Sequence, residues 1–468
     1  MQIIDRKRAE NLKIAYIGGG SRGWAWQLMT DLAMEENMSG EVALYDIDFE
    51  AARRNAVIGN RLGEKPEAVG KWVYTAYEKQ REALKDADFV VISILPGTFD
   101  EMASDVHTPE KYGVYQSVGD TAGPGGLVRA LRSGPMFQLI AEDIKAACPN
   151  AWVINYTNPM AILMRVLYDT FPAIKAVGCC HEVFHTQGLL CTALEKLRGI
   201  SGVKRSDLVT TVQGVNHFTW ITEAFYQGMD LVPVYKEFSE KYRETGFDES
   251  GDGNWMNNSF SSIQKVKFDL FLHFGAIAAA GDRHLAEFNP APRYLKDPET
   301  VKSWGFGLTT VEWRKQDLVR RLEKAQKVYD GEESLPLKAS GEEGVLMMKA
   351  LLGLGDMVTN VNIPNIGQIK NAPLGVVVET NAALRDHFLA PLMTGDMDET
   401  LLSLSMPAMS AQGEILQAIR HKDARLCLGA FLNDPLLCAL QPKDAIELYK
   451  EMLENTKKYL PGWNLDVE

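Results

Sequence analysis

Short apolar runs alternate with longer stretches of helical spacing along the first 200 residues of the chain. The apolar runs are of strand length and predict strands at Lys13–Gly18, Glu41–Asp46, Val73–Ala76, Phe89–Leu95, Ala151–Asn155 and Ala173–Gly178. Apolar positions at helical spacing predict helices at Ala25–Glu36, Ala51–Leu62, Glu78–Leu84 and Gly126–Ala147. Strands that alternate with helices favour a Rossmann-like fold of the α/β class, which is a doubly wound parallel sheet.

The pattern changes near residue 200. Two extended segments, Leu208–Val215 and Phe218–Tyr226, are close enough in sequence to pair antiparallel. The later segments predict helices at Ser262–Ala279, Thr310–Tyr329, Gly341–Leu352, Glu399–Arg420 and Pro442–Thr456, and strands at Met357–Ile363 and Gly375–Glu379. We therefore expect two domains, residues 1–200 with the parallel sheet and residues 201–468 with an α+β, largely helical structure. Gly246–Asn258 is rich in Gly, Asn and Asp and is predicted to be a flexible loop.

Composition agrees with two domains and excludes some partners. The 468 residues exceed the roughly 250 to 300 at which a single hydrophobic core stops growing. The net charge of -13 argues against a nucleic acid or an anionic membrane surface as partner, because both attract Lys and Arg. No apolar run reaches the roughly 18 residues that span a bilayer. The six cysteines are too sparse for a disulfide scaffold, so we expect reduced thiols and a cytoplasmic protein.

A glycine-rich turn follows the first predicted strand and precedes the first predicted helix. Its residues are Gly18, Gly19, Gly20, Ser21, Arg22 and Gly23. Backbone N–H groups in such a turn can approach a pyrophosphate, whose charge the helix N-terminus favours. Asp46 ends the next predicted strand, where a carboxylate can accept hydrogen bonds from a ribose 2′-hydroxyl and favour NAD over NADP. A strand-end aspartate without this role is the alternative interpretation.

Amides and a second glycine-rich turn indicate a sugar site beside the nucleotide. Asn155 and Asn158 follow a predicted strand at its carboxyl end, where open α/β sheets bind ligands, and side-chain amides can fix sugar hydroxyls or hold the cofactor. Turn chemistry before Pro159 explains them equally well. Asp120 opens the run Asp120–Gly126, which places a carboxylate before exposed N–H groups. A simple helix entry is the alternative.

A thiol and imidazoles provide candidate metal ligands. Cys180 opens the run Cys180, His181, Glu182, Val183, and His217 lies between the two extended segments of the second half. A thiolate with an imidazole suits a borderline or soft divalent cation. Spacing alone does not separate this from a buried inert cysteine and a core histidine. Because Cys179 and Cys180 are adjacent, an extended backbone would point them to opposite sides.

Together, these motifs resemble glycoside hydrolase family 4, the NAD-dependent glycosidases. The resemblance covers nearly the whole chain. It rests on IGGGSRGW at Ile17–Trp24, YDID at Tyr45–Asp48, GDTAGPGG at Gly119–Gly126, NYTNP at Asn155–Pro159, CHEV at Cys180–Val183, VNHFTW at Val215–Trp220 and VNIPNIGQIKNAPLGVVVE at Val361–Glu379. It implies that Cys180 and His217 hold a divalent cation, usually manganese (Mn2+). It also implies a homodimer or homotetramer.

Within that family, the residues after the cysteine track the substrate, and CHEV is similar to the α-galacturonidase group. Many α-glucosidases and phospho-α-glucosidases have Cys-Asp-Met-Pro instead, where the aspartate is the acid. This chain has His181 in that place, so His181 or Glu182 is expected to be the acid.

The family chemistry implies hydrolysis through oxidation at C3 of the sugar, loss of the C2 proton, elimination of the glycosidic oxygen, addition of water and re-reduction by the same NAD. The cation holds the C2 and C3 oxygens. The base near C2 is expected to be Asp282, and His284, two residues later, is a candidate for the metal shell, the acid or the substrate site; a structural role for both is the alternative. The uronate carboxylate needs a cation, for which Arg283, Arg129 and Arg132 are the candidates unless they are surface arginines.

Three other functions remain open from the sequence. An α-glucosidase or α-glucuronidase of the same family would share every motif. A lactate- or malate-like NAD dehydrogenase would share the nucleotide loop and the expected overall fold, which is like that of lactate and malate dehydrogenases, but it would release NADH. A non-catalytic NAD sensor would need neither the metal pair nor the amides.

Overall fold

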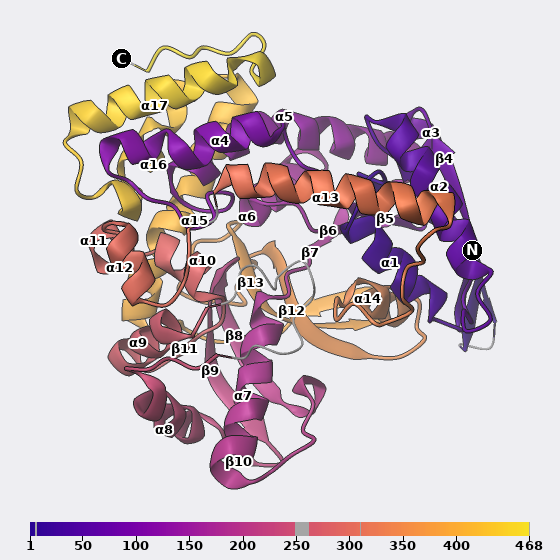
Figure 1. Ribbon diagram of the computed structural model, residues 1–468, viewed down its shortest axis with the longest axis horizontal. Coiled ribbons are helices and arrows are strands. Elements are labelled where there is room, and N and C mark those ends of the chain that lie inside the picture. The colour runs from indigo at the N-terminus through magenta and orange to yellow at the C-terminus, as the bar shows by residue number, and fades with distance from the viewer. Residues whose placement is uncertain (5–6, 249–261, 309, 468) are drawn as a thin grey trace.

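Six parallel strands form one side of a 10-stranded sheet in the computed structural model, which describes residues 1–4, 7–248, 262–308 and 310–467 (Figure 1). The parallel strands are β2 (Arg8–Ile17), β3 (Met38–Tyr45), β4 (Lys71–Tyr77), β5 (Phe89–Ile92), β6 (Trp152–Asn155) and β7 (Lys175–Gly178). Their spatial order is β4-β3-β2-β5-β6-β7, with β1 (Gln2–Ile4) antiparallel to β2. This is the strand order of dinucleotide-binding sheets, so the predicted Rossmann-like fold is confirmed.

Strands from the second half of the chain extend the same sheet. They are β12 (Met357–Pro364), β13 (Val377–Arg385) and β14 (Phe388–Pro391). β12 joins β7 antiparallel through Asn362 and Gly178, and β13 and β14 follow antiparallel. Residues on both sides of the predicted boundary at residue 200 therefore share one sheet, and the division into two domains stays a prediction.

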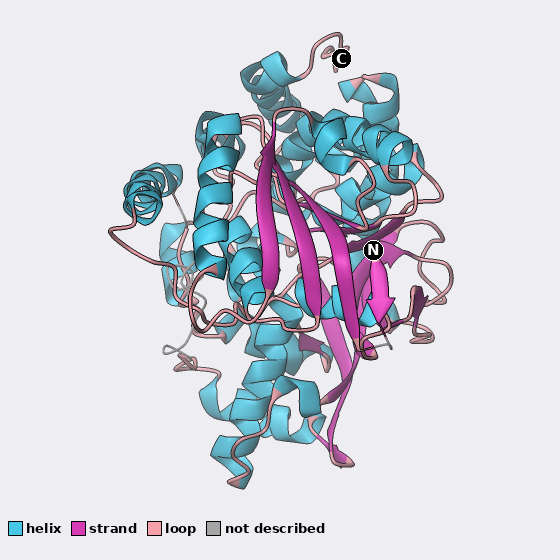
Figure 2. Ribbon diagram, turned by 90° about the vertical axis from the view of Figure 1, so that its right-hand side faces the viewer, coloured by secondary structure: helices cyan, strands magenta, loops and turns pink. Residues whose placement is uncertain are grey.

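Helices cover both faces of this sheet (Figure 2). One face packs against α1 (Trp24–Ala33), α2 (Phe49–Gly63) and α14 (Gly344–Leu351), and the other against α5 (Gly123–Ala147), α6 (Met160–Thr170) and α15 (Glu399–His421). Successive strand residues point to opposite faces, so Ile14 and Tyr16 of β2 pack on the first set of helices, and Ala15 and Ile17 pack on the second. Apolar residues on both faces explain the nearly continuous apolar runs in the sequence.

A smaller four-stranded antiparallel sheet carries His217 in the turn between two of its strands. It contains β8 (Val209–Val215), β9 (Phe218–Tyr226), β10 (Met229–Asp230) and β11 (Ile277–Ala278), and it packs with α7 (Glu182–Arg198), α8 (Val232–Tyr242) and α9 (Lys265–Phe274) around a separate apolar core. The pairing of β8 with β9 confirms the prediction for these segments.

One predicted helix is too long. The sequence predicted a helix from Ser262 to Ala279, whereas α9 ends at Phe274. Gly275 follows in the left-handed conformation, with φ of 75°, and ends the helix, and Ile277 then pairs with β9. The loop predicted at Gly246–Asn258 lies almost wholly outside the described residues.

The remaining α-helices lie in the connections between the elements described above or follow the last of them. They are α3 (Gln80–Leu84), α4 (Phe99–His107), α10 (Asp282–Glu287), α11 (Ala291–Tyr294), α12 (Pro298–Ser303), α13 (Val311–Asp330), α16 (Leu428–Leu432) and α17 (Pro442–Thr456).

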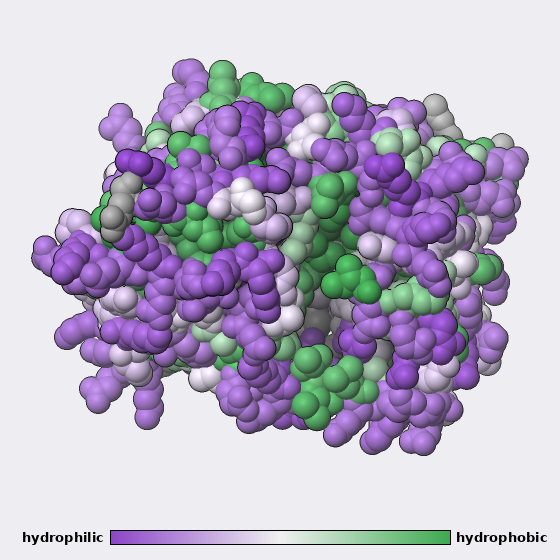
Figure 3. Space-filling model, turned by 90° about the horizontal axis from the view of Figure 1, so that it is seen from above, coloured by the Kyte–Doolittle hydropathy of each residue, from purple (hydrophilic) through white to green (hydrophobic). Residues whose placement is uncertain are grey.

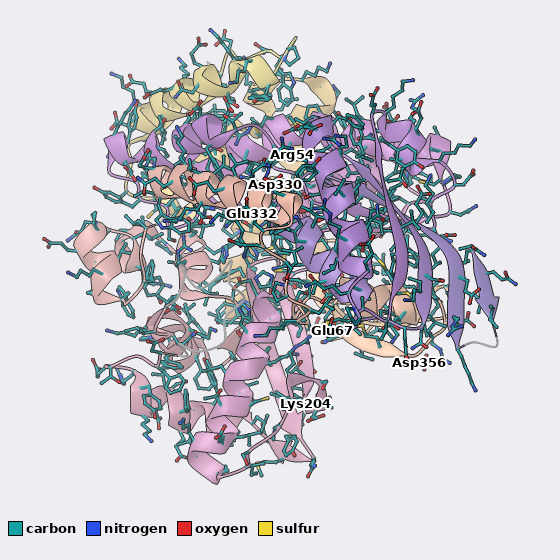
Figure 4. The ribbon with its side chains drawn as sticks, turned by 45° about the vertical axis from the view of Figure 1, so that its right-hand side comes forward. Arg54, Glu67, Lys204, Asp330, Glu332 and Asp356 are labelled. Atoms are coloured by element: carbon teal, nitrogen blue, oxygen red, sulfur yellow. The ribbon has the colours of Figure 1, made fainter. Side chains whose placement is uncertain are left out.

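The two ends of helix α13 contact different helices. At its first turn, the N–H of Val311 donates to Nε2 of His107 in α4 at 3.1 Å. Near its last turn, Arg54 of α2 donates to Gln326 at 2.7 Å and lies over the ring of Tyr329, 5.4 Å from its centroid. Figure 4 shows Arg54 beside the end of this helix at Asp330. The helix is therefore fixed at both ends, and its position is defined relative to the nucleotide half.

The surface agrees with the charged composition. Viewed from above (Figure 3), it is mostly hydrophilic, and hydrophobic side chains gather around a central hollow. Among the described residues, no helix combines the length and the apolarity that crossing a bilayer requires.

Candidate active site

Candidate residues from the first half of the chain gather at one edge of the large sheet. Gly18 follows β2, Asp46 follows β3, Asn155 ends β6 and Cys180 lies two residues after β7. These strands are parallel, so their carboxyl ends meet at the same edge. The strand order reverses between β2 and β5, and ligands of open α/β sheets bind at this point.

The glycine turn is too tight for side chains. Gly18 has φ of +94°, and a Cβ atom there would lie 2.0 Å from the backbone oxygen of Ser93. The N–H groups of Gly18 and Gly19 both donate to the oxygen of Tyr45, at 2.9 and 2.8 Å. Helix α1 begins next, with Gly23 as its N-cap and no side chain capping its first turn. The uncapped N-terminus suits an anionic group such as a pyrophosphate.

Asp46 belongs to this turn. Its Oδ2 accepts a hydrogen bond from the N–H of Gly20 at 2.9 Å, and its Oδ1 accepts one from the N–H of Asp48 at 3.0 Å. Burial raises the pKa of Asp46, although these two bonds oppose the rise. The carboxylate thus lies against the glycines, where a ribose would follow a pyrophosphate.

Asn155 and Asn158 differ in what their amides do. The side chain of Asn155 is fully buried, accepts from the N–H of Thr157 at 2.9 Å and donates to the oxygen of Thr157 at 3.1 Å. This amide therefore builds the turn. Oδ1 of Asn158 is buried and has no hydrogen-bond partner among the described residues. Of the two amides, only that of Asn158 has an acceptor left for a ligand.

Three side chains that could bind a metal ion come together from distant segments of the chain. One ligand atom each from Asp120, His217 and His284 lies within 4.8 Å of the others. The two imidazole rings are 3.9 Å apart between centroids. Thr121 joins the group, since its Oγ1 lies 2.8 Å from Oδ1 of Asp120 and 3.0 Å from Nδ1 of His217. His217 is in the left-handed conformation, with φ of 64°, in the turn between β8 and β9.

A second group of three lies beside the first. It consists of His181, Glu182 and His185 at the start of α7, again with ligand atoms within 4.8 Å of one another. Oε1 of Glu182 is 3.7 Å from Nε2 of His181 and 3.8 Å from Nε2 of His284, so Glu182 connects the two groups. Its other oxygen accepts from the N–H of Gly281 at 2.6 Å. We call these six residues the histidine cluster.

The histidine cluster divides into charged and neutral groups. Burial lowers the pKa of His217 to about 3, and the neighbouring His284 adds to the effect. Burial alone would raise the pKa of Glu182, but His284, His181 and the other imidazoles outweigh it and lower the pKa. Burial would also lower the pKa of His181, but the carboxylate of Glu342, 3.2 Å away, raises it to about 9. His217 is thus a neutral imidazole, the form that binds metal ions.

Cys180 lies next to the cluster and belongs to neither group of three. Its side chain is buried, and burial raises the pKa of the thiol, as do Glu379 and Glu182. The amide of Asn216, next to His217, lowers it. Cys180 packs in the apolar core of one sheet face and Cys179 in that of the other, which confirms that the adjacent cysteines point to opposite sides.

The donor set fits a divalent cation. Neutral imidazoles, a carboxylate and a thiol are ligands that zinc and first-row transition metals accept. Nδ1 of His284 and Oδ1 of Asn158 are buried without a hydrogen-bond partner among the described residues. Buried polar atoms are normally paired, so these atoms indicate a place that a ligand completes.

The predicted base and Arg283 have definite partners. The carboxylate of Asp282 is fully buried and accepts from the N–H of Lys267 in α9 at 3.0 Å, and it belongs to neither group of three. Arg283 donates to the backbone oxygens of Ser117 and Gly307. Asp282 stays a predicted base, but the structure does not bring its carboxylate into the histidine cluster.

Sequence reasoning missed two carboxylates. Glu342, before α14, contacts His181. Glu379 in β13 is fully buried, accepts from Thr219 and Asn360 at 2.8 and 2.6 Å, and has its pKa raised by burial to about 7. Glu379 is the last residue of the motif Val361–Glu379, and this was its one signal in the sequence. Glu342 belongs to none of the quoted motifs.

Comparisons with known proteins identify the family of the chain. A model of the family 4 glycosyl hydrolases matches residues 13–196, and a model of the C-terminal domain of that family matches residues 212–437. The α-galacturonidase of Thermoanaerobacterium saccharolyticum is 59% identical over 465 residues, which are 99% of this chain and 100% of the relative.

Solved structures show the same fold. The crystal structure of lplD from Bacillus subtilis, described as a glucosidase, is 49% identical with a TM-score of 0.90, covering 95% of this chain and 100% of that one. A 6-phospho-α-glucosidase from gut microorganisms, in complex with NAD and Mn2+, is 22% identical with a TM-score of 0.78, covering 98% of this chain and 100% of that one. At 22% identity the second likeness concerns the fold alone.

Proposed function

The chain belongs to glycosyl hydrolase family 4, and we propose that it hydrolyses α-galacturonides with the help of NAD and a divalent cation. The observation that carries the proposal is the position of the glycine turn beside the histidine cluster. Trp24, the first residue of α1, has its ring 6.1 Å from that of His181. A cofactor on the turn would therefore lie next to a sugar at the cluster.

The nucleotide half supplies the groups that would hold NAD. The N-terminus of α1 after Gly23 would receive the pyrophosphate. The glycine backbone at Gly18 and Gly20 would let the pyrophosphate come close, and Ser21 and Arg22 would lie beside it. Asp46 would accept a hydrogen bond from a ribose hydroxyl. Because the amide of Asn155 is used in its own turn, this residue would shape the pocket. When bound, NAD supplies a hydride acceptor for a sugar carbon, which a dehydrogenase-like sheet is suited to position.

The sugar half supplies the cation ligands. We assign them to Cys180 and His217, as the family resemblance implies, with His284 and Asp120 close enough to His217 to contact the sugar or a metal-bound water. A divalent cation supplies Lewis acidity to the sugar oxygens. Asn158 has a free amide acceptor for a sugar hydroxyl.

Three residues are candidates for moving protons. His181, between Glu342 and Glu182, is our candidate for the proton donor to the leaving oxygen, because both of its ring nitrogens face carboxylates that orient it. Glu182, held by Gly281, is placed to accept a proton within the cluster. Asp282 is the alternative base, and its Oδ1 accepts a hydrogen bond from the N–H of Lys267.

The experiment is an assay of the purified protein with Mn2+, NAD and a reducing agent on aryl α-galacturonide, α-glucuronide, α-glucoside and α-galactoside. We expect the galacturonide to be cleaved fastest, with NAD neither consumed nor released as NADH. In deuterated water the product should carry deuterium at C2. Faster cleavage of the α-glucoside would support an α-glucosidase, in line with the name glucosidase given to lplD. Stoichiometric formation of NADH would support a dehydrogenase.

We also propose a cytoplasmic homodimer or homotetramer. The described cysteines are free thiols, which supports a reducing compartment. Light scattering after size-exclusion chromatography would test the assembly, and a monomer under assay conditions would contradict it.

A further inference from the structure

A galacturonide differs from a galactoside by one carboxylate, so an enzyme that prefers the acid needs a cation near the sugar. Arg132 does not meet this need. Its guanidinium is fully buried, both of its Nη atoms donate to the carboxylate of Asp105, and its Nε donates to the oxygen of Pro96 at 3.0 Å. This arginine is saturated by structural partners.

Arg129, one helical turn earlier on α5, is different. Its side chain is only 5% exposed, and its Nε donates to the backbone oxygen of Asn158 at 3.2 Å. Its Nη1 is buried and has no hydrogen-bond partner among the described residues, and the same holds for Oδ1 of Asn158. A ligand that presents a carboxylate oxygen and a hydroxyl would satisfy this donor and this acceptor together.

Two further arginines lie close enough to Asp120 to act on its carboxylate electrostatically. Arg314 of α13 is one of them, together with Arg129 and the two histidines of the same group. Arg283 of α10 is also electrostatically coupled to Asp120 and to Arg314. Its guanidinium is fixed by the backbone oxygens of Ser117 and Gly307, so its orientation is set before a ligand arrives.

Glu287 on α10 supports the turn before Asp120. Its Oε1 accepts from the N–H groups of Val118 and Gly119, at 2.7 and 2.9 Å. Among the described residues, the unpaired donor of Arg129 and the unpaired acceptor of Asn158 are therefore the groups that a ligand would satisfy.

We propose that Arg129, Arg283 and Arg314 form the binding site for the carboxylate of the uronide, and that Arg129 makes the contact that distinguishes an acidic sugar from a neutral one. The proposal rests on the proposed function and gives it a specificity determinant. Three helices, α5, α10 and α13, each contribute one arginine, and α13 is fixed at both ends, so the site is rigid.

The test is to measure the dissociation constants of galacturonate and galactose for the wild type and for Arg129→Gln, both with NAD and Mn2+ present. We expect the constant for galacturonate to rise roughly 10- to 150-fold, the range of a hydrogen bond to a charged group. The constants for galactose and for NAD should stay unchanged. Arg129→Lys keeps the charge but cannot form two parallel hydrogen bonds to a carboxylate, so its dissociation constant for galacturonate should lie between those of the wild type and of Arg129→Gln.

Arg132→Gln is the matched control, because it removes an arginine from the same helix. It should lower the melting temperature by breaking the buried pair with Asp105 and leave the ratio of galacturonate to galactose affinity unchanged. Equal losses of affinity for galacturonate and galactose in Arg129→Gln would overturn the proposal, because the arginine would then only hold the pocket in shape and would not recognise the carboxylate. If that variant does not fold, Arg314→Gln takes its place with the same expected selectivity. A wild type that cleaves only neutral glycosides would refute the proposed function itself.

Discussion

The nucleotide half and the sugar half of the site are built in opposite ways. The nucleotide half comes from one continuous stretch, Gly18 to Asp48, and uses backbone N–H groups, a helix end and one carboxylate. The sugar half draws side chains from α5, α7, α10, the turn between β8 and β9, and the segment before α14. Its chemistry depends on imidazoles, carboxylates and guanidinium groups buried close together.

This difference predicts that the two halves fail separately. A backbone site is sensitive to added volume, because a Cβ atom at Gly18 would collide with Ser93. A side-chain site is sensitive to the loss of a charge or of a ligand atom. Substitutions at the histidine cluster should therefore remove turnover and spare cofactor binding, and substitutions at Asp46 should do the reverse.

The largest effect is expected at His217. His217→Asn removes the imidazole and keeps a residue type that tolerates the left-handed backbone of this position. We expect kcat to fall by at least about 1,000-fold, equivalent to about 4 kcal/mol, because a Lewis-acid site loses a ligand. Bound Mn2+, counted after dialysis, should fall as well.

The dissociation constant of NAD, measured by intrinsic fluorescence, should not change in the same variant. A comparable loss of NAD affinity would break the division between the two halves. Unchanged metal content with full activity would refute the assignment of His217 as a ligand.

The next effect concerns Glu287, whose pKa is raised by burial from 4.5 to about 8. The folded protein holds this proton more tightly than the unfolded chain. The stability that results is complete below pH 4.5 and is lost as the pH rises through about 8. Glu287→Gln cannot ionise, so the variant should match the wild type in acid and exceed it at pH 7 by on the order of 3 kcal/mol.

Denaturant unfolding across this pH range measures the difference. Gln keeps the oxygen that accepts from Val118 and Gly119, so the turn before Asp120 should be preserved. A constant difference at every pH would mean that packing, and not ionisation, is responsible.

The same contrast explains what the sequence could predict. The glycine turn and Asp46 are local features, and the structure has them where strand, turn and helix patterns predicted them. The sugar half joins residues as far apart as Asp120, His217 and Glu342, and no local pattern relates them. Only the family resemblance connected Cys180 with His217. Helix α7 was not among the predicted helices, although its buried residues Val183, Leu190 and Leu194 recur at helical spacing.

The smallest expected effect is at Asp46. Asp46→Ala removes an acceptor for the N–H of Gly20 and, in the proposed complex, for a ribose hydroxyl. We expect the dissociation constant of NAD to rise roughly 10- to 100-fold, as for other hydrogen bonds to charged groups, with kcat at saturating NAD unchanged. Asp46→Asn keeps one acceptor and should lose less. If kcat fell in Asp46→Ala while NAD still bound, the carboxylate would act on the position of the nicotinamide, and the two halves would be coupled through the cofactor.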